Sequence, residues 1–278
     1  MTSPDKAAAA DTANAQEVAD TPELLFRQEG ALAWVTFNRP QARNAMTWAM
    51  YDALKQVCER VDGDDSIRVL LLTGAGDKAF VAGTDISQFA SFGAGSEGTT
   101  YERRIDHVIS RLETVRKPTL ALIRGYAVGA GASLALTCDL RLATPSAQFG
   151  IPISRTLGNC LSLATYARLT DAIGPARTKE LLFTARLASA EEGHAMGLYT
   201  QVVPEEELEA RGRALAEQLA KRAPLTLWAT KESLRRLREA RLNGLDGSDI
   251  LERVYGSADF REGVSAFLQK RKPGWTGR

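Results

Sequence analysis

The sequence has 278 residues, of which 44% are apolar and 25% charged, and its formal net charge is +1. A net charge near zero argues against nucleic acid as a partner, and no apolar run approaches the roughly 20 residues that span a membrane, so no membrane partner is expected. The length accommodates one large domain, or one domain with a helical annex.

The three cysteines, Cys58, Cys138 and Cys160, lie far apart, and the two histidines, His107 and His194, stand alone. No pair among them has the spacing of metal ligands, so we expect no metal site. An odd number of separated cysteines is typical of a reduced protein. The N-terminus lacks the features of secretory and mitochondrial signals, and we therefore predict a cytoplasmic location.

The first quarter of the chain predicts a tail followed by strands and one helix. Residues 1–22 are rich in alanine and acids and are expected to be a disordered tail. Residues 24–40 predict two short strands, and Thr47 is the expected N-cap of a helix that runs to about Val61. Residues 67–74 form a continuous apolar run, which is typical of a strand covered on both faces.

The middle of the chain alternates strands and helices, which predicts an α/β protein. An apolar strand ends at Ala82, and the Gly/Ser-rich stretch 91–100 is expected to be a mobile loop that flanks a site. A helix is expected from about Tyr101 to Val115. Three further segments read as strands, at 119–125, 139–144 and 147–151. The chain is mostly helical from about Asn159, and we expect a core over residues 23–200 followed by a helical region over 201–278.

A corner of small residues, "GYAVGAGASLAL" at 125–136, comes where a helix is about to begin. The first four N–H groups of a helix have no partner inside it, and small side chains leave them uncovered. A dinucleotide site is one interpretation, but the third glycine of that motif is missing and the corner is not in the first strand-turn-helix unit. Close helix packing without a function is the other. This stretch alone does not choose between packing and a bound ligand.

Six segments, in order, change that balance: "NRPQARNAM", "AFVAGTDI", "KPTLALIRGYAVGAGASLALTCDLRLAT", "AQFGIP", "LLFTARLASAEEGHAMGLYTQVVP" and "FLQKRKPGW". Together they resemble the enoyl-CoA hydratase/isomerase family, also called the crotonase superfamily, over about residues 24–275. The resemblance implies a crotonase-like ββα spiral core and a helical C-terminal trimerisation region at 201–278. It further implies an acyl-CoA thioester as substrate, no cofactor beyond that CoA, and a homotrimer or dimer of trimers.

The resemblance also implies an oxyanion hole, formed by the backbone N–H groups of Thr84 in "AGTD" and Ala130 in "GAG". Elementary chemistry supports this assignment, because removing a proton or adding a nucleophile beside a thioester puts negative charge on its carbonyl oxygen. Fixed N–H donors at a helix start stabilise that charge. Loss of one such donor typically costs roughly 3 to 4 kcal/mol of transition-state stabilisation. We expect the strand before Thr84 to leave this residue exposed.

The sequence departs from the family at the two glutamates that hold and activate water in its hydratases. The first position is Ser133, and the second is Ile153, or Ser154 if the alignment slips by one residue. Serine without an adjacent base and isoleucine cannot replace a carboxyl in proton transfer. Ordinary hydration is therefore in doubt. Isomerase, thioester hydrolase, decarboxylase or dehalogenase chemistry stays open, as does a non-catalytic CoA- or RNA-binding scaffold.

Other residues are candidates for the missing proton-handling groups. Asp106 and His107 lie on the predicted helix where the 4-chlorobenzoyl-CoA dehalogenase branch of the family places a functional histidine, although both also read as solvated helix residues. Arg155 is a candidate to bind a carboxylate or carbonyl of the acyl group, or to serve at a surface. Cys160 is expected to be a small buried apolar residue rather than a nucleophile.

The resemblance also implies the contacts to the CoA ester. The backbone around Ala42 and Arg43, with Ala82, would flank adenine and pantetheine, and the Arg43 cation would suit the phosphates. Asp85 follows the oxyanion donor and either contacts substrate or fixes its loop. The remaining implied contacts are Ile86 at the acyl entry, Gly129 beside the oxyanion hole, and Phe267 and Lys270, which would reach the CoA of a neighbouring subunit.

Overall fold

The structure is a computed structural model that describes residues 21–89 and 95–278. Of the predicted tail at 1–22, residues 1–20 lie outside the described residues. Of the predicted loop at 91–100, residues 91–94 also lie outside the described residues. No helix in the described part of the chain is long and apolar enough to cross a membrane.

The described strands form two sheets. The larger has the order β1-β2-β3-β5-β7-β10, with β1 and β2 antiparallel and the other neighbours parallel. Its strands are β1 (Leu24–Glu29), β2 (Leu32–Phe37), β3 (Val69–Gly74), β5 (Thr119–Ile123), β7 (Leu140–Ala143) and β10 (Gln201–Val202). The smaller has the order β4-β6-β8-β9, with strands β4 (Ala79–Ala82), β6 (Tyr126–Val128), β8 (Gln148–Gly150) and β9 (Ala188–Ser189).

Helices connect the strands and continue to the C-terminus. The α-helices that lie among the strands are α1 (Trp48–Gly63), α2 (Gly95–Glu113), α3 (Ala130–Thr137), α4 (Leu163–Thr184, with a break at Gly174) and α5 (Ala190–Ala195). After the last strand come α6 (Leu208–Ala220), α7 (Pro224–Leu242), α8 (Ser248–Tyr255) and α9 (Ala258–Leu268). Short 3-10 helices are η1 (Pro40–Ala42), η2 (Ile86–Phe89) and η3 (Glu205–Glu207).

The chain builds both sheets in a repeated ββα order. The pairs β3–β4, β5–β6 and β7–β8 each give one strand to the larger sheet and the next strand to the smaller one, and helices α2, α3 and α4 follow these pairs in turn. Each turn therefore adds one strand to each sheet and one helix to the outside. This arrangement confirms the predicted α/β class and the ββα spiral.

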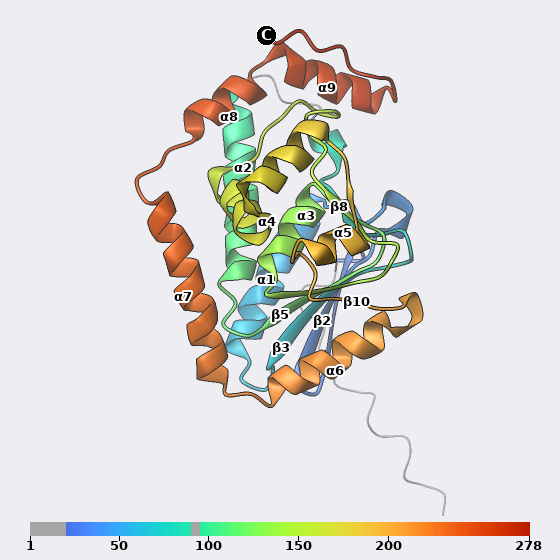
Figure 1. The fold of residues 1–278 in the computed structure, drawn as a ribbon, viewed down its shortest axis with the longest axis vertical. Helices are drawn as coiled ribbons and strands as arrows, with labels where there is room; N and C mark the ends of the chain where they lie inside the picture. Colours follow the sequence, from blue (N-terminus) through green and yellow to red (C-terminus); the bar gives the residue numbers. More distant parts are fainter. Residues whose placement is uncertain (1–20, 90–94) are drawn as a thin grey trace, which may run out of the picture.

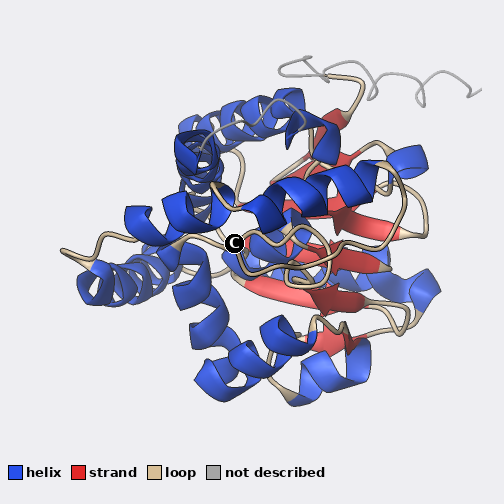
Figure 2. Ribbon diagram, turned by 90° about the horizontal axis from the view of Figure 1, so that it is seen from above, coloured by secondary structure: helices blue, strands red, loops and turns tan. Residues whose placement is uncertain are grey.

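The larger sheet is buried on both faces, which explains its continuous apolar strands. Side chains alternate along β3, so Leu70 and Leu72 join the main core while Val69 and Leu71 join a second cluster. Helix α6 covers that second cluster and lies across the sheet in Figure 1, and Figure 2 shows helices on both sides of the strands. The larger sheet is therefore enclosed by side chains and helices on both faces.

Helix α2 begins at Gly95, six residues before the predicted start at Tyr101. The first turn has poor helix propensity, with Gly95 and Gly98 in it. Tertiary packing stabilises it, because a Cβ on Gly98 would overlap the ring of Tyr255 in α8. The predicted loop at 91–100 is therefore helical from position 95 onward.

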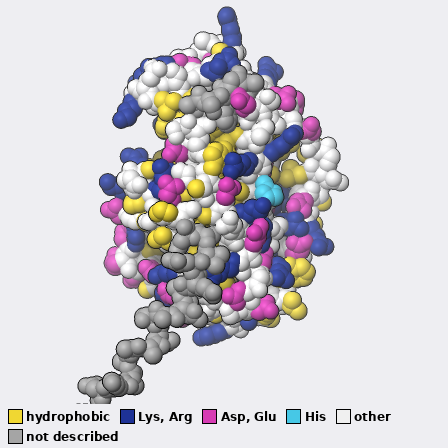
Figure 3. Space-filling model, turned by 180° about the vertical axis from the view of Figure 1, so that it is seen from behind, with side chains coloured by type: hydrophobic (Ala, Val, Ile, Leu, Met, Phe, Trp, Pro, Cys, Tyr) yellow, Lys and Arg dark blue, Asp and Glu magenta, His cyan; other side chains and the backbone are white. Residues whose placement is uncertain are grey.

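Helix α7 lies along one edge of the molecule and has no buried residue (Figure 1). Ion pairs tie it to the core, for example Lys231 to Asp139 at 2.7 Å. Its exposed side chains include Leu225, Leu234 and Leu237. On the face drawn in Figure 3, basic and acidic side chains are interspersed, with no large area of one sign, as the net charge of +1 suggests.

Candidate active site

A cavity of about 490 Å³ opens where β4, β6 and β8 end, between α2 and α9. Most of the residues singled out in the sequence line this one cavity. They are Ala42, Arg43, Ala82, Thr84, Asp85, Ile86, Gly129, Ala130, Ser133, Ile153 and Phe267. The parallel strands β4 and β6 pair Ala82 with Val128, so the segments that follow them emerge at the same edge.

The Thr84 N–H is directed away from its neighbouring chain segment. Thr84 forms a parallel bridge with Met46, in which Met46 N donates to Gly83 O and Asp85 N donates to Met46 O, both at 2.9 Å. Successive N–H groups of an extended segment point to opposite sides. The N–H of Thr84 therefore points the other way, and no acceptor for it is found among residues 21–89 and 95–278.

The Thr84 side chain is buried, which corrects the expectation that this residue is exposed. Only 7% of Thr84 is accessible, and its hydroxyl is hydrogen-bonded to Tyr51 Oη at 2.9 Å and to Tyr101 Oη at 2.8 Å. Burial raises the pKa of both tyrosines, so they stay neutral hydrogen-bonding groups. These bonds anchor the side chain in the core and fix the backbone amide at the cavity.

The small-residue corner serves close packing and leaves an N–H open. Gly129 is the N-cap of α3 with φ 58°, a conformation that disfavours residues with a Cβ, and a Cβ there would lie 3.4 Å from Gly83 Cα. A Cβ on Gly131 would overlap the carbonyl oxygen of Val81 in β4. Ala130 is thus the first helical residue, whose N–H has no partner within the helix. The glycines bring this N–H beside the segment that carries Thr84.

The two positions that correspond to the family glutamates face the cavity, and the slipped alternative does not line it. Ser133 is 6% accessible, and its hydroxyl makes only a long hydrogen bond of 3.4 Å to Gly129 O. Ile153 is a partly buried apolar residue on the cavity wall. Ser154 is exposed and donates to Leu182 O at 2.7 Å.

Neither Asp106 nor His107 is among the residues that line the cavity, and their role as replacements for the glutamates stays a prediction. Asp106 accepts a hydrogen bond of 2.8 Å from the Ser162 hydroxyl, and its burial raises the pKa of the carboxyl. His107 is exposed on α2. His107 therefore faces solvent, whereas Asp106 lies one turn after a lining residue on the same side of α2 without itself lining the cavity.

Glu102, one turn before Asp106, is the site residue that the sequence reasoning missed. It lines the cavity and is 7% accessible. Burial raises the pKa of this carboxyl to about 8, with a smaller upward contribution from Asp106. The available signal was periodicity, because Glu102, Ile105 and Ile109 share the core-facing stripe of the helix, where a charged residue is unexpected.

Asp85 lines the cavity and also fixes its loop. Its carboxylate accepts hydrogen bonds from the Ser87 hydroxyl at 2.8 Å and from the Arg39 guanidinium at 3.1 Å. Although burial opposes it, these partners hold the pKa of Asp85 below its usual value. Asp85 is therefore an ionised, fully engaged carboxylate and a poor proton acceptor.

Arg43 lies at the mouth of the cavity. Its side chain is exposed, and its guanidinium lies over the Tyr126 ring, 5.3 Å from the ring centre. Ala42 ends η1 next to it, and Ala82 N donates to Arg43 O at 3.0 Å. This places a cation beside the opening, with small side chains on the path inward.

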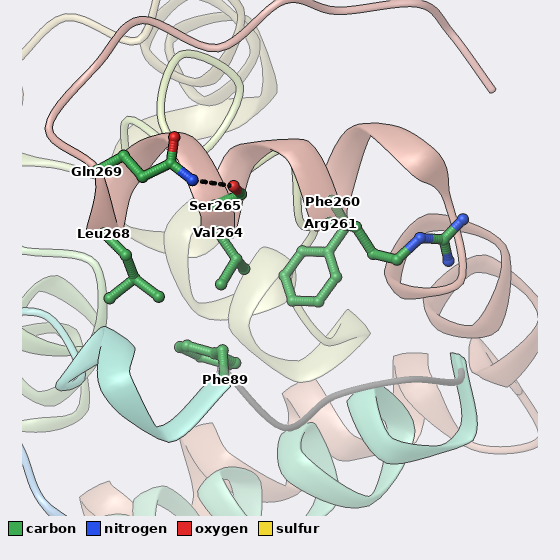
Figure 4. Close-up of a pocket in the computed structure, with 7 residues that line it drawn as sticks. All are labelled: Phe89, Phe260, Arg261, Val264, Ser265, Leu268 and Gln269. Atoms are coloured by element: carbon green, nitrogen blue, oxygen red, sulfur yellow. Dashed lines mark hydrogen bonds between the residues drawn. The ribbon is translucent and has the colours of Figure 1, made fainter.

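The C-terminal helix α9 covers one side of the cavity. Between α9 and η2 lies a second pocket, which shares Phe89 with the cavity, and there Phe260, Val264 and Leu268 of α9 face Phe89 of η2 (Figure 4). Phe267 lines the cavity of its own chain, whereas the sequence led us to expect it at a neighbour's CoA. Lys270 follows α9 and is not among the lining residues.

The other sequence candidates lie outside the cavity lining. Arg155 is exposed. Cys160 is buried, as expected, and burial raises the pKa of its thiol to about 12, which makes it a poor nucleophile. In the described part of the chain, no group of three His, Cys, Asp or Glu side chains is arranged to hold a metal ion.

Comparison with known proteins gives consistent matches over almost the whole chain. A sequence profile described as enoyl-CoA hydratase/isomerase matches residues 27–278. A short-chain-enoyl-CoA hydratase from Clostridium acetobutylicum is 31% identical, with 90% of this chain and 95% of that protein covered. A 1,2-epoxyphenylacetyl-CoA isomerase from Escherichia coli is 36% identical, with 92% and 98% covered. A methylmalonyl-CoA decarboxylase structure superimposes with a TM-score of 0.84 at 28% identity, covering 92% and 99%, which confirms the predicted fold.

Proposed function

The chain belongs to the enoyl-CoA hydratase/isomerase family, and we propose that it transforms an acyl-CoA thioester by holding charge on the thioester oxygen between the Thr84 and Ala130 N–H groups. The observation that supports this proposal is that Thr84 and Ala130, which lie on separate segments, line the same cavity, with Ala130 at the start of α3. Preorganised donors of this kind stabilise the developing oxyanion in the transition state. The proton or bond that moves lies next to the thioester carbonyl.

The acyl group is proposed to be atypical for a hydratase. Ser133 and Ile153 offer no carboxyl at the two cavity positions where family hydratases carry glutamates. The relatives reported above are named a hydratase, an isomerase and a decarboxylase, so the names of relatives do not select a reaction. We propose that a thioester enolate or oxyanion is the common intermediate. Hydrolysis and dehalogenation are further reactions that the same donors would support.

The CoA moiety is proposed to enter past Arg43 and Ala42, with its phosphates near the Arg43 cation and its acyl chain passing Ile86. No cofactor beyond this CoA is proposed. The exposed apolar side chains of α7 support a homotrimer or dimer of trimers, which light scattering would test.

Titration of the pure protein with propionyl-CoA, crotonyl-CoA and free CoA tests the proposal. We expect the thioesters to bind, and failure of every thioester to bind would remove the enzyme proposal in favour of a scaffold. The loss of crotonyl-CoA absorbance then measures hydration. We expect very slow hydration by the wild type and faster hydration by the double variant Ser133→Glu/Ile153→Glu. A fast wild type would show that water is activated by groups at other positions.

A further inference from the structure

One carboxyl on the cavity wall has no part in the proposed oxyanion hole. Glu102 projects from α2, and its Oε1 accepts a hydrogen bond from the Tyr255 hydroxyl of α8. Tyr255 Oη in turn accepts a hydrogen bond of 3.1 Å from Asn159 Nδ2. Asn159 also lines the cavity, so these side chains form a hydrogen-bonded chain along the wall that fixes the orientation of the carboxyl.

The surroundings of Glu102 contain acids and neutral groups. No Lys or Arg forms an ion pair with it in the described ranges. Burial is the main cause of its raised pKa, Asp106 adds to the effect, and hydrogen bonds from Tyr255 and the Ser162 main chain oppose it. The titratable groups that interact with it are Tyr51 of α1, Tyr101 and Asp106 of α2, Cys160 before α4, Tyr166 of α4, and Tyr255 of α8.

A purely structural role does not explain why this residue is a carboxyl. Glutamine would also accept the hydrogen bond from Tyr255 and tie α2 to α8, without the cost of burying an ionisable group. The cavity has one other carboxyl among its described lining residues, Asp85, and that group is engaged by Arg39 and Ser87. Glu102 is therefore the lining carboxyl suited to exchange protons.

We propose that Glu102 is the proton-transferring residue of this site, taking a proton from the acyl carbon next to the thioester and returning it. This inference rests on the proposed oxyanion hole. When the C–H bond breaks, its electron pair moves into the thioester to form an enolate, whose oxygen is held by the two N–H groups, and the proton passes to the Glu102 carboxylate. Return of a proton to carbon restores the C–H bond, so no oxidant, reductant or co-reactant is consumed.

Tyr255 and Asn159 act as positioning residues in this scheme. The Tyr255 hydroxyl engages Oε1 and fixes the carboxyl on the wall, and Asn159 fixes Tyr255. Asn159 Oδ1 is buried and accepts no hydrogen bond from the described residues. An unpaired buried acceptor is costly, and a donor on the bound acyl group would satisfy it.

Exchange of the α-hydrogens of propionyl-CoA in D₂O tests Glu102 directly, because this saturated thioester has no double bond to hydrate or shift. Mass spectrometry measures the deuterium gained. We expect exchange with the wild type and a rate lower by about 10²- to 10⁴-fold with Glu102→Gln, while the Kd for propionyl-CoA changes by less than about threefold. Glu217→Gln, the same substitution on the exposed face of α6, should match the wild type.

The pH profile separates proton transfer from a structural role. Exchange requires the ionised carboxylate, so the wild-type rate should rise with pH to a plateau, with a midpoint near the Glu102 pKa of about 8. Tyr255→Phe removes a hydrogen bond that favours the ionised form and should move the midpoint to higher pH. Asp106→Asn removes a like charge and should move it to lower pH. Midpoints that do not move in either variant would contradict the proposal.

The outcomes also separate this inference from the proposed function. Equal exchange by Glu102→Gln and wild type, or thioester binding without exchange, would overturn the role of Glu102 and leave acyl-CoA binding intact. Failure of the wild type to bind propionyl-CoA or crotonyl-CoA would overturn the proposed function, and the role of Glu102 with it.

Discussion

The two sides of the cavity are built by different means. At the corner where we propose the oxyanion hole, the functional atoms would be the main-chain N–H groups of Thr84 and Ala130, which follow paired strands, and small residues bring the two segments together. On the wall that carries Glu102, the functional atoms we propose are side chains of α2, α8 and the segment before α4. The residues of the corner belong to short sequence motifs that can be recognised without the structure. The wall forms only when α2 packs against α8, which lies far away in the sequence.

This difference separates charge stabilisation from proton transfer. Main-chain N–H donors do not lose their protons at neutral pH, so the proposed oxyanion hole would serve any acyl-CoA reaction that passes through an oxyanion. In the proposed scheme the Glu102 wall determines which proton moves, because burial and neighbouring groups set the pKa of its carboxyl.

The largest expected effect is on the pH dependence of stability, and it comes from the buried carboxyl of Glu102 on the cavity wall. The folded pKa of Glu102, about 8, lies above the usual 4.5, so the folded state holds this proton more tightly. The contribution of Glu102 to the free energy of unfolding should thus fall as pH rises from about 4.5 to 8. At about 1.4 kcal/mol per pH unit, the upper bound is about 5 kcal/mol.

Urea unfolding of the wild type and Glu102→Gln at several pH values measures this contribution. The stability of the variant relative to the wild type should increase between pH 5 and pH 9. If the stabilities of the wild type and the variant changed in parallel over this range, folding would not shift the pKa of the Glu102 carboxyl. The Glu102 wall would then have no tuned carboxyl to set it apart from the main-chain donors.

The corner should respond to loss of a single N–H. Proline is tolerated at the first helical position, and Gly129 before it has no Cβ to clash, so Ala130→Pro should fold while removing the Ala130 N–H. We expect propionyl-CoA exchange to fall by about 10²- to 10³-fold. Ala130→Gly, which keeps the N–H, is the matched control. Equal rates in the two variants would remove Ala130 from the oxyanion hole.

The sequence predicted the corner better than the wall, for a physical reason. Strands, the Thr47 cap and the small-residue motif are set by local patterns, and the structure has them where they were expected. Glu102 and Tyr255 are 153 residues apart, so no local pattern joins them. The start of α2 was missed for the same reason, since contact with α8 stabilises a turn that contains two glycines.

The packing of the corner predicts a smaller effect on stability. A methyl group at Gly131 would overlap the Val81 carbonyl oxygen, so Gly131→Ala should push α3 away from β4 and destabilise the protein by about 1 to 3 kcal/mol. Gly63→Ala is the control, because a Cβ at Gly63 meets no atom within 4 Å. Thermal unfolding compares the two, and similar midpoints would show that the corner is less tightly packed than described.

The smallest expected effect is on CoA-ester affinity and comes from Arg43 at the mouth of the cavity. Arg43 is exposed, so its contact with a CoA phosphate should contribute about 1 kcal/mol or less at moderate salt. We expect Arg43→Ala to weaken CoA-ester binding by roughly fivefold at low salt, with the difference disappearing as salt screens the charge. Calorimetric titration at two salt concentrations measures this. A salt-independent difference would indicate lost packing instead.

The central claim is that two backbone N–H groups from separate segments bind a single thioester oxygen. The infrared difference spectrum of bound crotonyl-CoA, labelled with ¹³C at the thioester carbonyl, reads that contact directly. The carbonyl stretch should move to lower frequency on binding the wild type, and Ala130→Pro should reverse part of that shift. A bound carbonyl with the frequency it has in water, or an identical shift in both proteins, would contradict the account.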